Sequence, residues 1–349
     1  MHQQIPLVGL PLHELTTLLH PLPRFRSVQI YKWIARGVLD YDQMTDLPLA
    51  VREKLKERFP LCSAKQISRH DDRHAVKIVL ALEDGVKIES VLLSDGKERL
   101  TACLSTQAGC PAGCVFCKTG QMGFIRNLNS AEIIEQFLFL RTAALRTIAH
   151  EKKMREIENI VIMGMGEPLL NPAHLRKAIA VIIDPEGMNF SKRRITISTC
   201  GIYDGIIDIA ENGPLVRLAL SLTTADELLR QKLMPVTATQ PLKKIKEALI
   251  HFQHKGGGRI TLEAALLGGI NTRREDAASI AEFAKGIDAV VNLIPWNPVA
   301  GLEFEGKPLR EPDKKETEDF ITMLESLGLK VTRRLGKGRK VMGACGQLG

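Results

Sequence analysis

Three cysteines lie close together in the segment Gly109-Cys-Pro-Ala-Gly-Cys-Val-Phe-Cys117; they are Cys110, Cys114 and Cys117. This C-x-x-x-C-x-x-C spacing supplies three thiolates from one loop. A four-iron cluster held by three thiolates keeps one iron open for a small molecule. A zinc site with a remote fourth ligand and buried structural cysteines are the alternatives. Zinc motifs usually bring two C-x-x-C pairs, and the sequence has no second pair. The spacing therefore favours an iron–sulfur cluster.

The composition narrows the class of protein. The chain has 349 residues, of which 44% are hydrophobic, 25% charged and 5% aromatic. These values exclude disorder and fibrous repeats and argue against a stacking-rich binder of single strands. No apolar run approaches the roughly 18 to 20 residues of a membrane span, and the N-terminus lacks signal-peptide order. We expect a cytoplasmic protein without a membrane partner, in which seven cysteines favour metal or redox chemistry over structural disulfides.

Strand-like and helix-like segments alternate around and after the cysteines. This rhythm predicts a parallel sheet with right-handed crossovers. No G-x-G-x-x-G motif opens a helix, so an α/β fold with a partial or full (β/α) barrel fits better than a Rossmann sheet. The expected strands are 100–106, 160–163, 194–198, 217–222, 260–265, 290–295 and 329–333, and the expected helices are 130–145, 173–183, 242–254, 276–285 and 314–327.

The segment before the barrel is organised differently. Helical spacing at 10–19, 27–36 and 49–59 predicts a small helical unit, whose cations form either a solvated face or an RNA-docking surface. Two alternating segments flank Glu83-Asp84-Gly85 and predict a β-hairpin. The expected organisation is an N-terminal helical accessory domain (1–70), a β-hairpin extension (71–98), a barrel (99–335) and a C-terminal tail (336–349).

Small and polar residues follow several predicted strands, where a barrel places its chemistry. Glycine lets a ligand approach the backbone, a carboxylate accepts hydrogen bonds from an ammonium group, and small polar groups suit hydroxyls and base edges. Individually, each could equally be a turn or a helix cap. The candidate binding residues are Gly166, Glu167, Ser198, Ser221, Leu222, Thr223 and Asn297.

Several motifs occur together in a fixed order. The chain resembles the radical-SAM superfamily, in particular its RlmN/Cfr branch of RNA adenine methyltransferases, over nearly its whole length. The resemblance implies a [4Fe-4S] cluster on the three cysteines and S-adenosylmethionine (SAM) on the candidate binding residues, although the family usually has histidine where Thr223 stands. The motifs are Cys103-Leu-Ser-Thr-Gln-Ala-Gly-Cys110, Gly123-Phe-Ile-Arg-Asn-Leu128, Met163-Gly-Met-Gly-Glu-Pro-Leu-Leu-Asn171, Arg194-Ile-Thr-Ile-Ser-Thr199 and Gly343-Ala-Cys-Gly-Gln-Leu348.

The resemblance also implies a mechanism that uses Cys345, Cys103 and Glu89. Cys345 receives a methyl group from one SAM, and a radical from a second SAM activates that methyl group for addition to adenine. Glu89 is the expected base for the ring proton, with a plain surface carboxylate as the alternative. Cys103 then attacks Cys345 to release the product, which leaves a disulfide. Cys62 and Cys200 are expected to be inert small hydrophobes.

The implied substrate is carbon 2 of an adenosine in 23S rRNA, with tRNA as a further candidate. Carbon-8 methylation of the Cfr type, another RNA, and a non-methylating iron–sulfur RNA-binding protein are the alternatives. The net charge of +8 suits a polyanion. An external electron donor, a thiol reductant and a monomeric state complete the expectations. Six cations lie shortly before Cys345, where they suit phosphates: Lys330, Arg333, Arg334, Lys337, Arg339 and Lys340. The relatives in the resembled family carry acidic residues where Arg339 and Lys340 stand.

Overall fold

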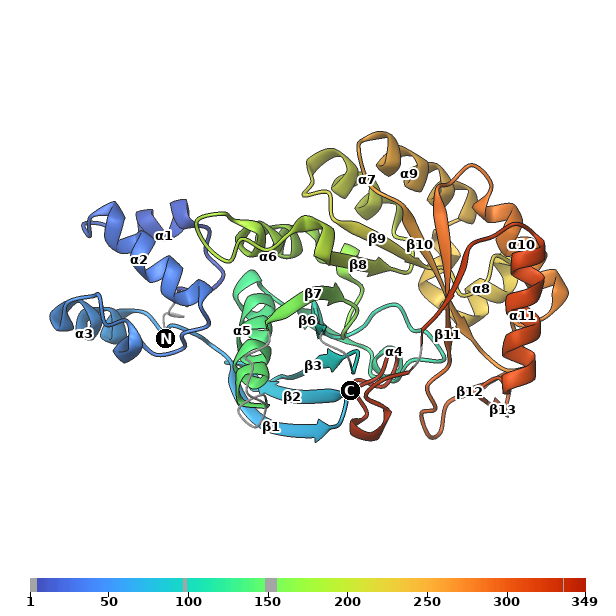
Figure 1. Cartoon of the computed structure of the whole chain (residues 1–349), viewed down its shortest axis with the longest axis horizontal. Helices are drawn as coiled ribbons and strands as arrows, with labels where there is room; N and C mark the ends of the chain where they lie inside the picture. Colours follow the sequence, from blue (N-terminus) through green and yellow to red (C-terminus); the bar gives the residue numbers. More distant parts are fainter. Residues whose placement is uncertain (1–4, 97–98, 148–155, 335) are drawn as a thin grey trace.

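One ten-stranded sheet runs through the molecule (Figure 1). The computed structural model describes residues 5–96, 99–147, 156–334 and 336–349. The strand order is β1-β2-β3-β4-β7-β8-β9-β10-β11-β14, and the outermost strands β1 and β14 do not pair with each other in these described ranges. The sheet is therefore open, and the expected barrel is a partial one.

The parallel part of the sheet carries the predicted strand–helix alternation. Neighbouring strands of the main sheet from β4 to β14 pair in parallel, and helices connect most of them. Buried apolar residues recur along strand and helix alike, which confirms the expected α/β architecture. The strands are β4 (Leu100–Cys103), β7 (Ile157–Ile162), β8 (Ile195–Thr199), β9 (Arg217–Ser221), β10 (Ile260–Leu266), β11 (Ala289–Pro295) and β14 (Val331–Arg333), and the helices are α5 (Ser130–Thr147), α6 (Pro172–Ile183), α7 (Tyr203–Asn212), α8 (Glu227–Leu233), α9 (Leu242–His254), α10 (Arg274–Ala284) and α11 (Lys314–Ser326).

The expected hairpin is present but belongs to a larger unit. Strands β2 (Ala75–Ala81) and β3 (Lys87–Ser94) pair antiparallel. Strand β3 also pairs antiparallel with β4, and β1 (Lys65–Asp72) pairs antiparallel with β2. Strand β1 is mostly exposed and polar and shows no apolar alternation, so the sequence pattern does not predict it. The boundary residues 98 and 335 of the expected domains lie outside the described residues.

The loop with the three cysteines is closed by a short strand pair. The expected strand 100–106 ends at Cys103, where the chain leaves the main sheet; β5 (Gln107–Gly109) then pairs with β6 (Phe124–Asn127). The loop contains the short helix α4 (Lys118–Gln121), and a second small pair joins β12 (Glu303–Phe304) to β13 (Lys307–Pro308). A Cβ atom at Gly109 would lie 1.9 Å from the Gly123 carbonyl oxygen, and Gly109 has φ +70°, so this closure requires glycine.

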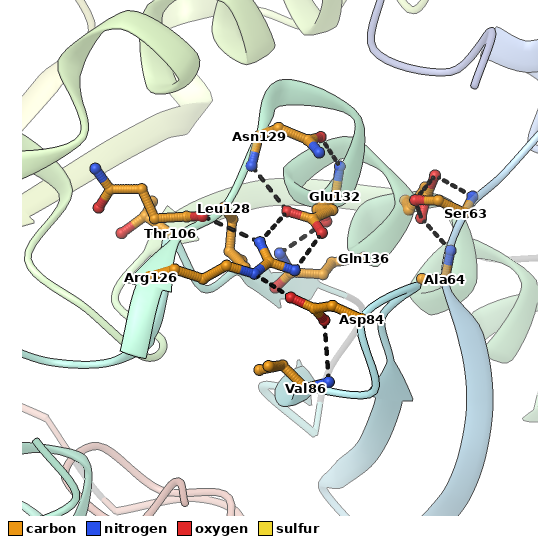
Figure 2. Close-up of polar contacts among 12 residues, drawn as sticks. Ser63, Ala64, Asp84, Val86, Thr106, Arg126, Leu128, Asn129, Glu132 and Gln136 are labelled. Atoms are coloured by element: carbon orange, nitrogen blue, oxygen red, sulfur yellow. Dashed lines mark hydrogen bonds and ion pairs between the residues drawn. The ribbon is translucent and has the colours of Figure 1, made fainter. Parts of the chain in front are cut away.

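A polar network fastens this loop to the hairpin and to α5. Figure 2 shows Arg126 between Asp84 of the hairpin turn and Glu132 of α5, with N–O distances of 2.6 and 2.8 Å. The Glu132 carboxylate accepts from the Asn129 amide (2.8 Å), and the Asn129 side chain accepts from the Glu132 amide (3.0 Å). This reciprocal cap lies at Asn129, directly before α5, which begins at Ser130 as expected.

The N-terminal helices α1 (Leu12–Leu18), α2 (Arg24–Ala35) and α3 (Leu49–Arg58) lie at the opposite end of the molecule from α7 and α9–α11 (Figure 1). The fully buried carboxylate of Glu135 on α5 accepts from the backbone amides of Ser63 (2.7 Å) and Ala64 (2.8 Å), where the chain passes from these helices to β1. No helix in the described ranges is long and apolar enough to cross a membrane.

We expect Glu135→Ala to lower the free energy of unfolding by about 3 kcal/mol, because it leaves the Ser63 and Ala64 amides without an acceptor. Urea unfolding followed by tryptophan fluorescence measures the change. Glu135→Gln keeps one acceptor oxygen and should lose less. Glu282→Ala is the matched control, since that side chain is 71% exposed, and should change stability by less than about 0.5 kcal/mol. Equal stability of Glu135→Ala and the wild type would contradict this role.

Candidate active site

The three cysteines of the loop line one cleft at the carboxyl ends of the parallel strands. The cleft spans about 980 Å³ of space, part of which is open to solvent. Its lining residues are far apart in the sequence, from the cysteine loop to the C-terminal tail. Among the residues that line it are Cys110, Cys114, Cys117, Gly166, Glu167, Ser198, Cys200, Ser221, Thr223, Glu263, Trp296, Asn297 and Cys345.

The donor set of this cleft fits an iron–sulfur cluster. Burial raises the pKa of Cys110 to about 12 and raises the pKa of Cys114 and Cys117 as well, so these thiols hold their protons until a metal displaces them. No three potential ligand side chains among the described residues are grouped tightly enough to hold a single metal ion. A four-iron cluster takes each thiolate on a different iron, so its ligands need not converge on one point.

Gly166 and Glu167 form one wall of the cleft. The buried Glu167 carboxylate accepts from the Thr199 hydroxyl (2.7 Å) and from the amides of Cys200 (2.8 Å) and Leu169 (3.0 Å). The bonds to Thr199 and Cys200 join the loop that follows β7 to the end of β8. Gly166 has φ +106°, and a Cβ atom there would lie 2.6 Å from the Gln107 side chain, so the close approach requires glycine.

The opposite wall contains a connected set of polar side chains. The Ser198 hydroxyl lies 3.0 Å from the Ser221 hydroxyl and donates to Glu263 (2.9 Å). Sequence reasoning missed Glu263, although a lone carboxylate in the apolar strand β10 is a usable signal. Of the predicted residues, Leu222 is buried and does not line the cleft in the described structure, whereas Thr223 does.

Thr223 has an unusual backbone. Its φ is 60°, which is rare for a β-branched residue and costs about 1–3 kcal/mol. The Thr223 amide donates to the Glu263 carbonyl (2.9 Å), and the Asn271 side chain donates to the Thr223 carbonyl (2.8 Å). These two bonds hold the residue in place at the rim of the cleft.

The C-terminal tail is bonded to the cysteine loop and to the strand ends. The Lys118 amide donates to the Gly346 carbonyl (2.8 Å), and the Asn297 side chain donates to the Cys345 carbonyl (3.0 Å). Trp296, next to Asn297, donates from its indole to the Phe116 carbonyl (2.8 Å). Cys345 is therefore held at the mouth of the cleft.

A second cavity, of about 1020 Å³, meets the cleft at Cys345. Cys345 lines both, and Cys103 lines the second cavity together with Arg334 and Lys337. Burial raises the pKa of Cys103 to about 12, and the half-buried Arg334 acts against that rise. The structure thus brings together two cysteines that are far apart in the sequence.

Glu89 lies at the far end of the tail rather than in either cavity of the described residues. Its carboxylate pairs with Lys77 (3.0 Å) and accepts from the Gly349 amide (3.0 Å), and its side chain is 14% exposed. Both side chains of the ion pair are largely buried, so Glu89 is not the plain surface carboxylate of the alternative interpretation.

The cations of the tail divide into two groups. Arg339 pairs with Glu311 at 2.6 and 3.0 Å and donates to the Asn297 side-chain oxygen (2.7 Å). Lys337 donates to the Ser94 carbonyl (2.8 Å). These two cations therefore hold the tail, and those left exposed for a polyanion are Lys330, Arg333 and Lys340.

Two residues beside the cleft carried no usable signal in the sequence. Cys200, expected to be a bystander, lines the cleft and bonds through its amide to Glu167. Arg230 on α8 is buried and donates to backbone carbonyls at the ends of β8 and β9. A single arginine on a short helix reads as a surface residue, so only its packing reveals its position.

Known proteins resemble the chain in the same segments. A model of the radical SAM superfamily matches residues 104–284, and a model of the ribosomal RNA large subunit methyltransferase N-terminal domain matches residues 5–61. A crystal structure of a radical SAM methyltransferase from Sphaerobacter thermophilus matches with a TM-score of 0.91 and 35% identity over 99% of both chains.

Similar sequences cover nearly the whole chain. The probable dual-specificity RNA methyltransferase RlmN of Treponema denticola is 47% identical over 327 residues, which are 93% of this chain and 90% of that protein. The protein of the same name from Thermus thermophilus is 40% identical over 346 residues, covering 96% and 94%. The chain therefore belongs to the RlmN-type RNA methyltransferases of the radical SAM superfamily.

Proposed function

We propose that this enzyme methylates carbon 2 of an adenosine in 23S rRNA, and also in tRNA, through an S-methylated Cys345. The observation that carries the proposal is the position of Cys345, which lines both the cleft of the three cysteines and the cavity of Cys103. The names of the relatives, dual-specificity RNA methyltransferases, support two RNA substrates. Because all of these groups belong to one chain, a monomer suffices, and we place the reaction in the cytoplasm.

The residues of the cleft would hold both cofactors. Cys110, Cys114 and Cys117 would ligate a [4Fe-4S] cluster, and SAM would lie along the polar walls. When bound, the two groups supply the methyl carbon and the radical that an unactivated aromatic carbon requires. The predicted SAM contacts are Gly166, Glu167, Ser198, Ser221, Leu222, Thr223 and Asn297, of which all but Leu222 line the cleft.

Cys345 carries the methyl carbon, so that the bond to adenine forms while this carbon is attached to the protein. Release then requires the thiolate of Cys103, and Arg334 favours this charged form beside the cavity. The Cys103 sulfur attacks the Cys345 sulfur, a disulfide forms and the bond from Cys345 to carbon breaks. The carbon departs with the electron pair and takes up a proton. An external thiol reductant restores both cysteines.

Glu89 is proposed as the base that removes the ring proton. Its ion pair with Lys77 (3.0 Å) fixes the position of the carboxylate. Its bond to the Gly349 amide places it beside the tail that carries Cys345. An adenosine that enters between the tail and the antiparallel strands would lie near both groups.

Nucleoside mass spectrometry of rRNA and tRNA from cells with and without the gene tests the substrate. We expect 2-methyladenosine to disappear from both RNAs without the gene and to stay absent when Cys345→Ala is supplied. Cys62→Ala, at a cysteine outside both cavities, is the control and should restore methylation. Loss of 8-methyladenosine instead would establish the carbon-8 alternative. Nucleosides that do not change would favour the alternative of a non-methylating iron–sulfur RNA-binding protein.

Cys103→Ala should trap the enzyme on its substrate, because the covalent link between Cys345 and adenine then lacks the thiolate that releases it. Denaturing gels with labelled RNA should show a protein–RNA band that withstands reductant. Cys103→Ala/Cys345→Ala removes the attachment point and should remove the band. Multiple turnovers by Cys103→Ala would exclude the resolving role.

We expect Arg339→Ala to loosen the tail, because it breaks the bonds to Glu311 and to Asn297, whose side chain holds Cys345. Hydrogen exchange of peptides covering 343–348 should become about tenfold faster, which corresponds to a loss of about 1.4 kcal/mol in local stability. Arg333→Ala, at an exposed cation of the same segment, should leave exchange unchanged. Equal exchange in both variants would contradict the tail contact.

A further inference from the structure

Arg230 is a buried cation that the proposed mechanism does not use. It lies on α8 and is 1% exposed. It has no ion pair with a carboxylate in the described part of the chain. A buried charge without a counter-charge is costly, and arginines are seldom buried unless they are paired. Such a position therefore favours a further negative charge close to the guanidinium.

The guanidinium is held by backbone carbonyls. One terminal nitrogen, Nη2, donates to the Cys200 carbonyl (2.5 Å); the other, Nη1, donates to the carbonyls of Ser221 (3.1 Å) and Leu222. Its Nε–H is buried without a partner in the described structure. Carbonyl dipoles satisfy hydrogen bonds but carry no net charge, so these contacts do not neutralise the positive charge of Arg230.

Two carboxylates that could pair with Arg230, those of Glu227 and Glu167, bond to other groups. Glu227, one turn earlier on α8, is exposed and accepts from the Leu242 amide (2.5 Å). Glu167 bonds to the amide of Cys200, whereas Arg230 bonds to the carbonyl of that residue. Neither carboxylate forms an ion pair with the guanidinium in the described ranges.

Arg230 lies directly behind the wall of the cleft that carries the cluster ligands. Cys200, whose carbonyl it binds, lines that cleft together with Met234, one turn after Arg230. The Val115 amide, next to Cys114, donates to the Leu233 carbonyl of α8 (3.0 Å). Burial lowers the pKa of Arg230 to about 10, while Cys200, Cys114 and Glu227 act against that decrease, so the group is charged at neutral pH.

We propose that Arg230 is the counter-charge of the iron–sulfur cluster and raises its reduction potential. The inference rests on the proposed cluster. Three thiolates outweigh the positive charge of an oxidised four-iron core, and reduction by one electron from an external donor adds a further negative charge. A buried cation stabilises the more negative, reduced form, and net charge near a cluster is one of the factors that set its potential. Arg230 would thus act on the reaction only through the reduction potential of the cluster.

The test is a potentiometric titration of the reconstituted, anaerobic full-length enzyme, followed by the electron paramagnetic resonance signal of the reduced cluster. At a fixed potential, Arg230→Met should reduce the ratio of reduced to oxidised cluster about tenfold, which is a decrease of about 59 mV in midpoint for one electron. Arg230→Lys keeps the charge and should shift the midpoint less. Arg176→Met removes an arginine that pairs with Asp208 away from the cleft and should not shift it.

Each outcome decides the proposal. A merely structural arginine predicts that the Met and Lys variants lose thermal stability alike, with an unchanged midpoint, and that result would overturn it. If the Met variant does not fold, Arg230→Gln, which keeps donors for the carbonyls but not the charge, takes its place. If the neutral variants fold but bind no iron, while Arg230→Lys binds about four irons per chain, the counter-charge role is supported. If Arg230→Lys also binds no iron, that role is refuted. Iron that never binds to the wild type would instead refute the cluster.

Discussion

The hydrogen bond from the Cys110 amide to the Gly123 carbonyl (2.8 Å) closes the loop that carries the three cysteines proposed to ligate the cluster. Only glycine at position 109 allows the two backbones to approach so closely. From this closure, Arg126 reaches Asp84 of the hairpin turn and Glu132 of α5 (Figure 2). A loop rich in cysteines thereby becomes a fixed part of the sheet edge, and the cleft takes its shape from it.

The C-terminal tail then completes the site. It lies on the cysteine loop through the bond from Lys118 to Gly346 and against the strand ends through Asn297. Cys345 thus lines two cavities, one of which is lined by the three cysteines of the loop and the other by Cys103. This placement gives a single sulfur access to both halves of the proposed reaction, which an arrangement on one rigid strand would not allow.

Charge is distributed unevenly around these cavities. The sequence suggested that the cations before Cys345 bind phosphates, but Arg339 instead pairs with Glu311 and holds Asn297. The tail therefore uses part of its positive charge for its own attachment. Beside the cleft, the buried Arg230 forms no ion pair with a carboxylate in the described part of the chain, and its guanidinium donates to backbone carbonyls.

Local patterns determined much of this protein. The spacing of the cysteines predicted the kind of cofactor, and the alternation of strand and helix predicted an open or closed α/β barrel, because both depend on residues that are close in sequence. The roles of Cys345 and Cys103 came from family motifs. Only the tertiary structure revealed the exposed strand β1 and the buried Arg230 as parts of the architecture. Their positions depend on contacts between distant segments, and burial of a charge is a property of packing that no local pattern contains.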